Sequence, residues 1–418
     1  MDTTPKANRI HIALLGRTNT GKSSFLNLIA GQDVSITSDI AGTTTDVVEK
    51  TMELAPLGPV VFLDTAGLGD TTALAAERMK KTEKVFERAD VVVLIVESGT
   101  WTEYEDAVCK RSAAMGIPLA VVVNKCDRVS VTDEYARLVR ERCPVWFACS
   151  AIDSQRRETV RGEFSRALVA AIPPDALQDP VLIGDLVGAG RTAVLVVPVD
   201  LEAPKGRLIL PQVQTIRDLL DNDAMALVVK ERELTAVLDN LKQPPALVVC
   251  DSQVVLKVCA DTPPQVPLTT FSILFSRLKG DLIVQSAGAA AIDSLKPESK
   301  VLIAEACSHH PIGDDIGRVK IPRWLSQYLG FAPQIDTYAG RDYPDTLEEY
   351  SLVIHCGGCM FNRRQMLYRL RAAQETKVPV TNYGVCISYL QGVIERTLAP
   401  FPAALAALRK EKTARRKS

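Results

Sequence analysis

Short apolar runs, many of them β-branched, alternate with amphipathic stretches over residues 9–172 of the chain. Each run is followed by turn-forming residues and then by helical periodicity, which is typical of parallel strands joined by crossover helices. The pattern therefore predicts an α/β domain built around a parallel sheet. The predicted strands are His11–Leu15, Val60–Leu63, Val91–Val96, Leu119–Val123 and Val145–Ala148.

Two proline-containing breaks divide the remaining chain. The first is Pro173-Pro174, and the second runs from Pro263 to Pro267. The segment between them contains no catalytic motif, which indicates a spacer or oligomerisation role. Its two cysteines, Cys250 and Cys259, are expected to be buried as small apolar groups. Its apolar runs predict buried strands at Ala193–Val197, Ala226–Val229 and Ala246–Val249, and a helix near Val213–Leu220.

Beyond the second break, strands and helices alternate again. Apolar residues from Phe271 to Leu278 fall at helical spacing, and Gly280 is suited to cap that helix. The remaining pattern predicts a small doubly wound α/β domain, with strands at Val301–Ala304, Gln334–Ile335, Ser351–Ile354 and Val378–Val380 and helices around Trp324, Met366 and Leu390. The chain is thus predicted to be an α/β protein with domains at residues 1–174, 175–265 and 266–400, and a solvated, frayed basic tail at 401–418.

The composition is that of an ordinary globular protein. Of 418 residues, 47% are hydrophobic and 24% are charged, and the formal net charge is −1. This balance gives no overall attraction to nucleic acid or anionic lipid, so we expect neither a nucleic-acid nor a membrane partner. The opening residues lack the apolar core of a signal peptide, and a cytoplasmic location is expected. In such a reducing compartment, ten cysteines indicate burial or metal ligation rather than disulfides.

A phosphate-binding loop follows the first predicted strand. Residues 16–23, Gly-Arg-Thr-Asn-Thr-Gly-Lys-Ser, match the pattern G-x-x-x-x-G-K-S between a strand and a helix. The glycines allow backbone N–H groups to surround phosphate oxygens at a helix N-terminus. Lys22 can reach the β- and γ-phosphates, and Ser23 can ligate Mg²⁺. The residues expected to bind nucleotide here are Gly16, Asn19, Thr20, Gly21, Lys22, Ser23 and Ser24.

Two further segments are suited to the γ-phosphate side of such a site. Asp64-Thr65-Ala66-Gly67 ends a predicted strand, which would place Asp64 near the Mg²⁺ ion and the Gly67 amide near the γ-phosphate. Thr44, within a run of threonines before that strand, can complete the Mg²⁺ shell in the triphosphate state.

Two more segments are suited to the base. Asn124-Lys125-Cys126-Asp127 ends another predicted strand, and the Asp127 carboxylate can accept two hydrogen bonds that guanine donates and adenine does not. Ser150 and Ala151 are expected to support the base from the other side. Because these segments all follow the phosphate loop in the expected order, the sequence predicts a site for GTP and GDP.

Over residues 9–172 these motifs resemble the TrmE–Era branch of translation-factor-like GTPases. Position 68 is leucine rather than a water-orienting glutamine, so intrinsic hydrolysis is expected to be slow. In members with an asparagine where this chain has Asn19, that residue holds a potassium ion beside the phosphates. The resemblance implies potassium-stimulated hydrolysis in which Lys22, Asn19, Thr44 and Gly67 take part. The alternative is that Asn19 only stabilises the loop.

Candidate metal ligands lie after two predicted strands of the last domain. Cys307 and His309 follow one strand, and His355, Cys356 and Cys359 follow another. Both segments can meet because ligands collect at the carboxyl ends of strands in an open α/β sheet. Three thiolates with a fourth, non-thiolate ligand would hold a [4Fe–4S] cluster, whereas two cysteines and two histidines would form a tetrahedral zinc site. A redox pair, or no metal, is a further alternative.

The order of a nucleotide domain, a motif-poor middle domain, Cys-x-His and then His-Cys-x-x-Cys is similar to the HydF family of [FeFe]-hydrogenase maturation GTPases. The resemblance covers nearly the whole chain. It implies that Cys307, Cys356 and Cys359 bind a [4Fe–4S] cluster and that the middle domain forms a homodimer. It also implies that the protein accepts a diiron subcluster precursor and delivers it to apo-[FeFe]-hydrogenase. Radical-SAM maturases, HydE-like and HydG-like, would be the upstream partners.

The sequence leaves the fourth cluster ligand open. His309 and His355 match the motif, and Glu305, Asp185 or water could also serve. Cys386 is a possible spare ligand, although a buried core thiol is the simpler interpretation.

Two other functions fit parts of the sequence. One is a tRNA-modifying or ribosome-associated GTPase with a structural zinc site, which the lack of a strongly basic, aromatic-rich surface disfavours. The other is an iron–sulfur redox enzyme with a regulatory GTPase domain, for which no substrate-site signature is found.

Overall fold

The structure is a computed structural model that describes residues 5–31, 48–64, 83–174, 181–198, 208–306, 315–340, 342–344 and 346–416. The chain folds into two compact units, Met1–Asp179 and Pro180–Ser418. Both units are α/β, as the sequence predicts, and their sheets are mostly parallel.

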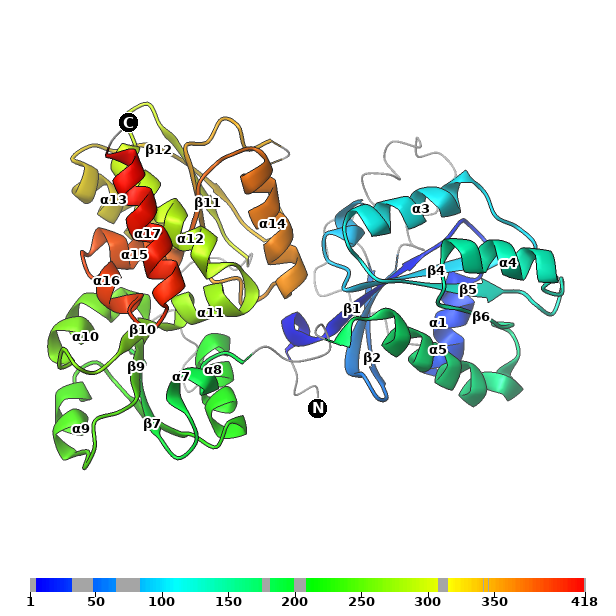
Figure 1. The fold of residues 1–418 in the computed structure, drawn as a ribbon, viewed down its shortest axis with the longest axis horizontal. Coiled ribbons are helices and arrows are strands. Elements are labelled where there is room, and N and C mark those ends of the chain that lie inside the picture. Colours follow the sequence, from blue (N-terminus) through cyan, green and yellow to red (C-terminus); the bar gives the residue numbers. More distant parts are fainter. Residues whose placement is uncertain are drawn as a thin grey trace. The chain divides into compact units, whose positions relative to one another are not determined.

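The first unit is built on a six-stranded sheet in the order β2-β3-β1-β4-β5-β6 (Figure 1). All pairings are parallel except that of β2 with β3. The sequence analysis missed β2, because its glutamates and lysine give an edge strand little apolar signal. The strands are β1 (Ile10–Leu15), β2 (Val48–Leu54), β3 (Gly58–Asp64), β4 (Val91–Glu97), β5 (Leu119–Asn124) and β6 (Trp146–Ala148).

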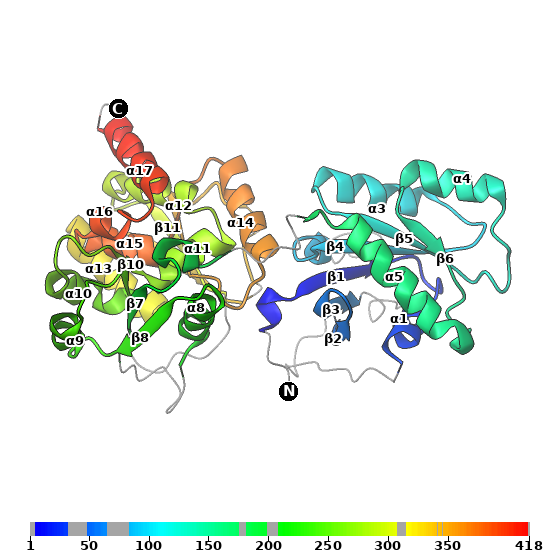
Figure 2. The same cartoon turned by 60° about the horizontal axis from the view of Figure 1, so that its bottom comes forward.

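Helices cover both faces of this sheet, which is how a parallel sheet buries its apolar strands. On one face, Phe25 of α1 (Lys22–Ala30) and Phe164 of α5 (Arg157–Ala171) pack edge to face, with ring centroids 5.3 Å apart. On the other face lie α3 (Glu103–Ala114) and α4 (Asp133–Arg142), which bury Val108 and Val139 (Figure 2). Because β1 lies between β3 and β4, the loop after β1 emerges at the centre of the carboxyl edge.

The second unit contains two four-stranded parallel sheets. The first has the order β10-β9-β7-β8 and the second has the order β12-β11-β13-β14. The elements of the first sheet region are α7 (Gly184–Val187), β7 (Thr192–Val196), α8 (Leu210–Asp221), β8 (Met225–Val229), α9 (Leu234–Asn240), β9 (Leu247–Cys250), α10 (Val255–Asp261) and β10 (Leu268–Thr270). Cys250 is fully buried, as predicted, whereas Cys259 is half-buried and packs against the core.

One prediction for this region is wrong. The run Ala226–Val229 was expected to be a buried strand, but β8 lies at the edge of its sheet and much of it faces solvent. Met225 is 52% exposed and Val228 is 45% exposed. A continuous apolar run predicts burial on both faces, so β8 has the sequence of an interior strand in an edge position.

The second sheet follows with α11 (Phe271–Lys279) and α12 (Leu282–Ala289) before its first strand. Helix α11 ends at Gly280, as predicted. The core on one face includes Leu325 of α13 (Ile321–Leu329) and Val385 of α15 (Tyr383–Leu390), and the core on the other face includes Leu370 of α14 (Arg363–Glu375). The remaining elements are β11 (Lys300–Ala304), α13 (Ile321–Leu329), β12 (Gln334–Tyr338), β13 (Leu352–His355), α14 (Arg363–Glu375), β14 (Val380–Asn382), α15 (Tyr383–Leu390) and α16 (Ile394–Thr397).

The basic tail is not frayed over the part that the structure describes. Residues Pro402–Arg415 form helix α17, which packs along α12. Ala404 and Leu408, one turn apart, are buried, so the helix has an apolar stripe that the charge run conceals in the sequence. Among the described residues, no helix combines the length and apolar character needed to cross a membrane.

Candidate functional site

The phosphate loop joins β1 to α1 in the way the sequence predicts. Gly21 has a φ of 93°, in the left-handed region that favours glycine, and directly precedes α1. The Lys22 side chain folds back into the loop, where its Nζ donates to the carbonyl oxygens of Gly16 at 2.7 Å and Arg17 at 2.8 Å. The ammonium group is therefore held inside the loop, in position to meet phosphate oxygens.

A buried carboxylate braces this loop, and the sequence analysis did not anticipate it. Arg17 donates from Nε to Oε1 of Glu105 at 2.7 Å, and Glu105 is fully buried. The other oxygen of Glu105 accepts from the backbone N–H of Thr102 at 2.8 Å, which forms the capping box of α3. Thr102-x-x-Glu105 is a readable capping signal, but only the structure shows that the same carboxylate reaches the phosphate loop.

The base-binding segments are brought together at the carboxyl edge. Asn124 donates from Nδ2 to the carbonyl of Thr20 at 2.9 Å and accepts from the backbone N–H of Ala151 at 2.9 Å. Ser150 donates to Oδ1 of Asp127 at 2.6 Å. This bond holds the pKa of Asp127 below its ordinary value, so the carboxylate is ionised and able to accept from guanine. Asn124 thus connects the phosphate loop to the base-binding loops.

Several predicted nucleotide and metal residues lie outside the described residues. These are Thr44, Gly67, Leu68, Cys307 and His309, and of Asp64 only the backbone at the end of β3 is described. Asn19 is exposed, with a φ of 65°. Ser23 and Ser24 are exposed at the start of α1, and Lys125, also at a positive φ of 63°, lies 3.2 Å from the carboxylate of Glu97.

The second candidate site lies at the carboxyl edge of the last sheet. The strands β11 and β13 are neighbours there, and the Cys356 backbone N–H donates to the Ala304 carbonyl at 2.9 Å. The Ala306 N–H in turn donates to Sγ of Cys356 at 3.0 Å. Burial raises the pKa of the Cys356 thiol to about 12 and also raises that of Cys359. Backbone N–H groups directed at cysteine sulfur are suited to a thiolate that ligates a metal.

A buried lysine lies behind this cysteine loop. Lys279, the last residue of α11, is 3% exposed. Its Nζ donates to the carbonyl oxygens of Phe361 at 2.8 Å, Cys359 at 3.1 Å and Gly358 at 3.3 Å. Burial lowers the pKa of Lys279 to about 8, while the thiols of Cys359 and Cys356 act in the opposite direction. No sequence motif marks this residue.

His355 points away from the cysteines. Strand alternation places it on the α14 face of the sheet with Val353, whereas Cys356 packs against the opposite core. Its Nδ1–H donates to the Cys356 carbonyl at 3.0 Å, and its Nε2 accepts from Arg369 at 3.1 Å. Burial and the Arg369 charge lower the His355 pKa to about 3, so the ring is neutral. With both nitrogens engaged, this geometry speaks against His355 as the fourth ligand.

The two carboxylates that the sequence offers as a fourth ligand are each paired with an arginine. Glu305 directly follows β11 and is buried, and its carboxylate lies 3.3 Å from the guanidinium group of Arg318. Asp185 forms a two-pronged ion pair with Arg277. Cys386 is completely buried in the core, which confirms the simpler interpretation of that thiol. Within the described part of the chain, no cluster of three or more His, Cys, Asp or Glu side chains is assembled to hold a metal ion.

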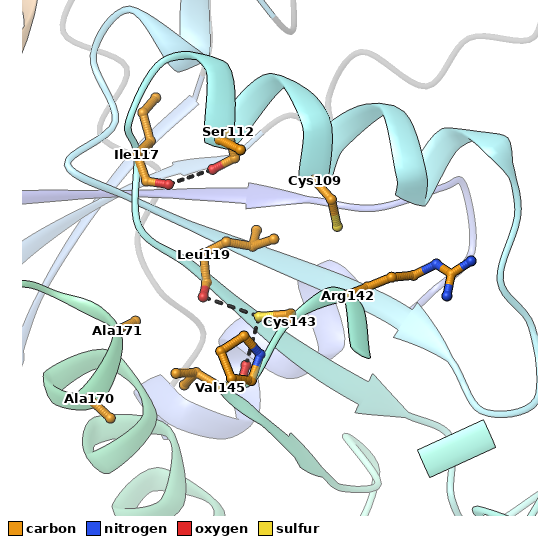
Figure 3. A pocket seen from close by; sticks show the side chains of 11 residues that line it. Cys109, Ser112, Ile117, Leu119, Arg142, Cys143, Val145, Ala170 and Ala171 are labelled. Carbon is orange, nitrogen blue, oxygen red and sulfur yellow. Dashed lines mark hydrogen bonds between the residues drawn. The ribbon is translucent and has the colours of Figure 1, made fainter. Parts of the chain in front are cut away.

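A surface depression of about 340 Å³ in the first unit belongs to neither site (Figure 3). It lies beside the start of β5, at the edge of the sheet opposite the nucleotide loops. Burial raises the pKa of its two thiols, to about 11 for Cys109, so both are protonated at neutral pH. The lining residues are Cys109, Ser112, Ala113, Ile117, Leu119, Arg142, Cys143, Pro144, Val145, Ala170 and Ala171.

Comparison with known proteins gives a GTPase domain and two assembly domains. A family model described as "50S ribosome-binding GTPase" matches residues 11–125. The hydrogen maturase F dimerization domain matches residues 182–280, and the hydrogen maturase F tetramerization domain matches residues 263–400. Together, the last two models cover the whole second unit apart from its ends.

Individual curated relatives match a quarter to a third of the chain. The tRNA modification GTPase MnmE of Nitrosospira multiformis is 40% identical over 119 residues, which is 28% of this chain and 26% of that protein. GTPase Der of a Nitratiruptor species is 32% identical over 142 residues, 33% of this chain and 30% of that protein. The chain therefore spans about a quarter to a third of the length of these relatives.

Among solved structures, the G domain of the T. maritima FeoB iron transporter is 17% identical, with a TM-score of 0.30, and the match covers 38% of this chain and 99% of that one. Together, the three family models cover more of the chain than any of these individual matches. With a GTPase domain followed by the dimerization and tetramerization domains of hydrogen maturase F, the chain belongs to the HydF family of hydrogenase maturation GTPases.

Proposed function

We propose that this protein is a GTP-hydrolysing scaffold that binds a [4Fe–4S] cluster through Cys307, Cys356 and Cys359. In this role it accepts a diiron precursor and delivers the diiron subcluster to apo-[FeFe]-hydrogenase. The observation that carries the proposal is the hydrogen bond from the Ala306 N–H to Sγ of Cys356. It brings Ala306, which lies two residues beyond β11 and one residue before Cys307, up to the Cys-Gly-Gly-Cys loop.

The described donors fit a metal cluster better than they fit an ordinary core. Two cysteines lie on one loop, and Gly358 between them has a φ of 63°, which bends the loop. Burial raises the pKa of the Cys356 thiol, and the amides of Gly358 and Ala306 act in the opposite direction. Three thiolates would supply the ligands of a cluster with one exchangeable iron, to which an incoming diiron unit can attach. Cys356 and Cys359 are half-buried, and the neighbouring Met360 is exposed.

The nucleotide domain supports a switching role. Lys22 would meet the phosphates, Asn124 and Asp127 would support and bind guanine, and Mg²⁺ would be held by Ser23 and Thr44. Bound nucleotide can bias delivery only by favouring one conformation or one partner complex over another. We therefore assign to GTP hydrolysis the release or exchange of protein partners rather than iron chemistry.

We also propose that β8 is the dimer contact of the middle domain. It pairs with β7 on one side only among the described residues and has exposed apolar side chains, and it lies within the segment that matches the dimerization domain. Pairing two β8 strands from two copies would satisfy the free backbone groups and bury the apolar side chains. Val228→Lys should lower the mass measured by light scattering, and Leu256→Lys, on the exposed surface of α10, should not. A Val228→Lys protein of unchanged mass would contradict this contact.

Anaerobic reconstitution with iron and sulfide tests the scaffold function. The wild type should turn brown, give an EPR signal after reduction and activate apo-hydrogenase once the precursor is supplied. Changing Cys307, Cys356 and Cys359 together to serine should abolish the iron and the activation. Cys259→Ser, a cysteine of the same unit outside the site, should change neither. A triple variant that still activates hydrogenase would disprove the proposal.

A tRNA-modifying function predicts a different metal. It is favoured by the name of a curated relative, but that match covers only 28% of this chain. A colourless protein that carries one zinc ion per chain would support it, and metal analysis of the freshly purified protein separates the two functions.

A further inference from the structure

Lys279 is a buried cation without a carboxylate partner among the described residues. All three of its ammonium protons are donated to carbonyl oxygens of residues 358, 359 and 361. Its other close neighbour is the ring of Phe275, whose centroid lies 5.6 Å away. The residues whose charge acts on Lys279 are Cys359 and Cys356.

Such an arrangement is unfavourable unless an anion lies close by. A buried ammonium group loses its hydration, and carbonyl dipoles return only part of that free energy. The C-terminal end of α11 adds some favourable potential, because Lys279 is its last residue. No carboxylate among the described residues offsets this charge. Cys356 and Cys359, whose sulfurs would become negative on binding iron, belong to the loop that Lys279 bonds.

We propose that Lys279 is the built-in counter-cation of the cluster and the residue that positions the Cys-Gly-Gly-Cys loop. This inference rests on the proposed cluster-binding function. Three thiolates around an oxidised [4Fe–4S] core leave one net negative charge, which the ammonium balances. Reduction adds a second negative charge, which the same ammonium stabilises further. Lys279 therefore raises the reduction potential of the cluster and slows its loss.

Three substitutions separate the charge from the geometry. Lys279→Met removes both the charge and the donors, and Lys279→Gln removes the charge but keeps a donor for the loop carbonyls. Lys279→Arg keeps the charge. The matched control is Lys300→Met, which removes a lysine at the start of β11, where Lys300 pairs with Asp336 at 2.9 Å on the opposite edge of the same sheet.

The reconstituted proteins are titrated with a reductant and followed by EPR, and iron release to a chelator is timed. Lys279→Met and Lys279→Gln should shift the reduction equilibrium about tenfold toward the oxidised form, a potential about 59 mV more negative for one electron. Both should also lose iron about tenfold faster. Lys279→Arg and Lys300→Met should stay close to the wild type in both measurements.

The unfolding temperatures of the cluster-free proteins test whether Lys279 has only a structural role, because the loss of a purely structural lysine would lower the unfolding temperature. Without a cluster, Lys279→Met should unfold at nearly the same temperature as the wild type, because the loss of three hydrogen bonds to loop carbonyls is offset by the removal of an uncompensated buried charge. A Met variant that melts lower but keeps the wild-type potential would show that Lys279 only packs, and Lys279→Gln with an unchanged potential would overturn the proposal. A wild type that takes up no cluster would instead refute the proposed function itself.

Discussion

Each unit has a candidate site at the carboxyl edge of a parallel sheet: the nucleotide edge of the first unit, with the phosphate loop, and the cysteine edge of the second, with the Cys-Gly-Gly-Cys loop. At both edges a buried lysine donates hydrogen bonds to carbonyl oxygens of a glycine-containing loop. Lys22 is 9% exposed and bonds two carbonyls of the phosphate loop, and Lys279 is 3% exposed and bonds three carbonyls of the cysteine loop. Both loops leave the carboxyl end of a strand in a parallel sheet. The two sites thus use the same device, an ammonium group held in place for an anion.

They differ in where the anion comes from. At the nucleotide edge it is the phosphate of a diffusible ligand, whereas at the cysteine edge we propose that it arises when the protein's own thiols bind iron. The first edge therefore exchanges its anion in every cycle. The second edge keeps its anion while the cluster is bound, and only cargo attached to the cluster exchanges. This difference fits a switch at one site and a scaffold at the other.

The largest expected effect concerns the choice of guanine over other bases at the nucleotide edge. The cysteine edge binds no base and has no such requirement. Asp127→Asn should weaken GTP binding by about 10²–10⁴-fold, because it removes two hydrogen bonds to a charged acceptor, each contributing ~1.5–3 kcal/mol. The amide can donate to the 2-oxo group of xanthine, so XTP binding should improve. Titration calorimetry with both nucleotides measures the change. Asp133→Asn, on the exposed start of α4, is the matched control, and equal losses in both variants would contradict this assignment.

A second prediction tests the lysine that is common to both edges. Lys22→Met should lower the GTP hydrolysis rate by about 10²–10³-fold, the usual loss when one group that stabilises transition-state charge is removed. Phosphate release under saturating GTP measures it. Lys110→Met, an exposed lysine of α3, should hydrolyse GTP at the wild-type rate. If Lys22→Met keeps most of its activity, Lys22 is only a structural brace and the parallel with Lys279 fails.

The two edges also differ in how far the sequence could predict them. Lys22 donates to carbonyl oxygens five and six residues earlier in the chain, so one short sequence motif contains both the lysine and its acceptors. Lys279 bonds carbonyls 79–82 residues away, and no local pattern can report such a contact. The same limit applies to Glu105, which reaches Arg17 across 88 residues.

The fold itself was largely predictable because it depends on local periodicity. The apolar runs for β1 and β11 give strands with nearly the predicted bounds. The failures occur where burial is decided by neighbours: β8 has an apolar run but lies at an edge, and the charges of α17 conceal a buried stripe. His355 adjoins Cys356 in the sequence, yet strand alternation sends the two side chains to opposite faces.

A third prediction concerns the cation that would assist hydrolysis at the nucleotide edge. The exposed Asn19 side chain lies in the phosphate loop, and we propose that it holds K⁺ there. Hydrolysis should be about tenfold faster in potassium than in sodium buffer, a modest gain for one added charge near the phosphates. Asn19→Ala should remove the difference, and Asn27→Ala, exposed on α1, should retain it. Equal rates in the two buffers for the wild type would reject the potassium site.

The smallest effect is expected at His355, and it decides whether the cysteine edge is built from charge alone. His355→Gln should retain the wild-type iron content and EPR signal, because His355 faces α14 and both of its nitrogens are hydrogen-bonded. Its cost should appear in folding, as a loss of about 1–3 kcal/mol in the free energy of unfolding, because glutamine cannot keep both ring hydrogen bonds, to the Cys356 carbonyl and from Arg369. Denaturant unfolding measures the second quantity, and Cys356→Ser provides the comparison for the first. If His355→Gln loses iron as Cys356→Ser does while remaining folded, the histidine is a ligand after all. Metal binding at the cysteine edge would then require His355 to turn toward the cysteines as a neutral ligand, and the three thiolates balanced by Lys279 would not be sufficient.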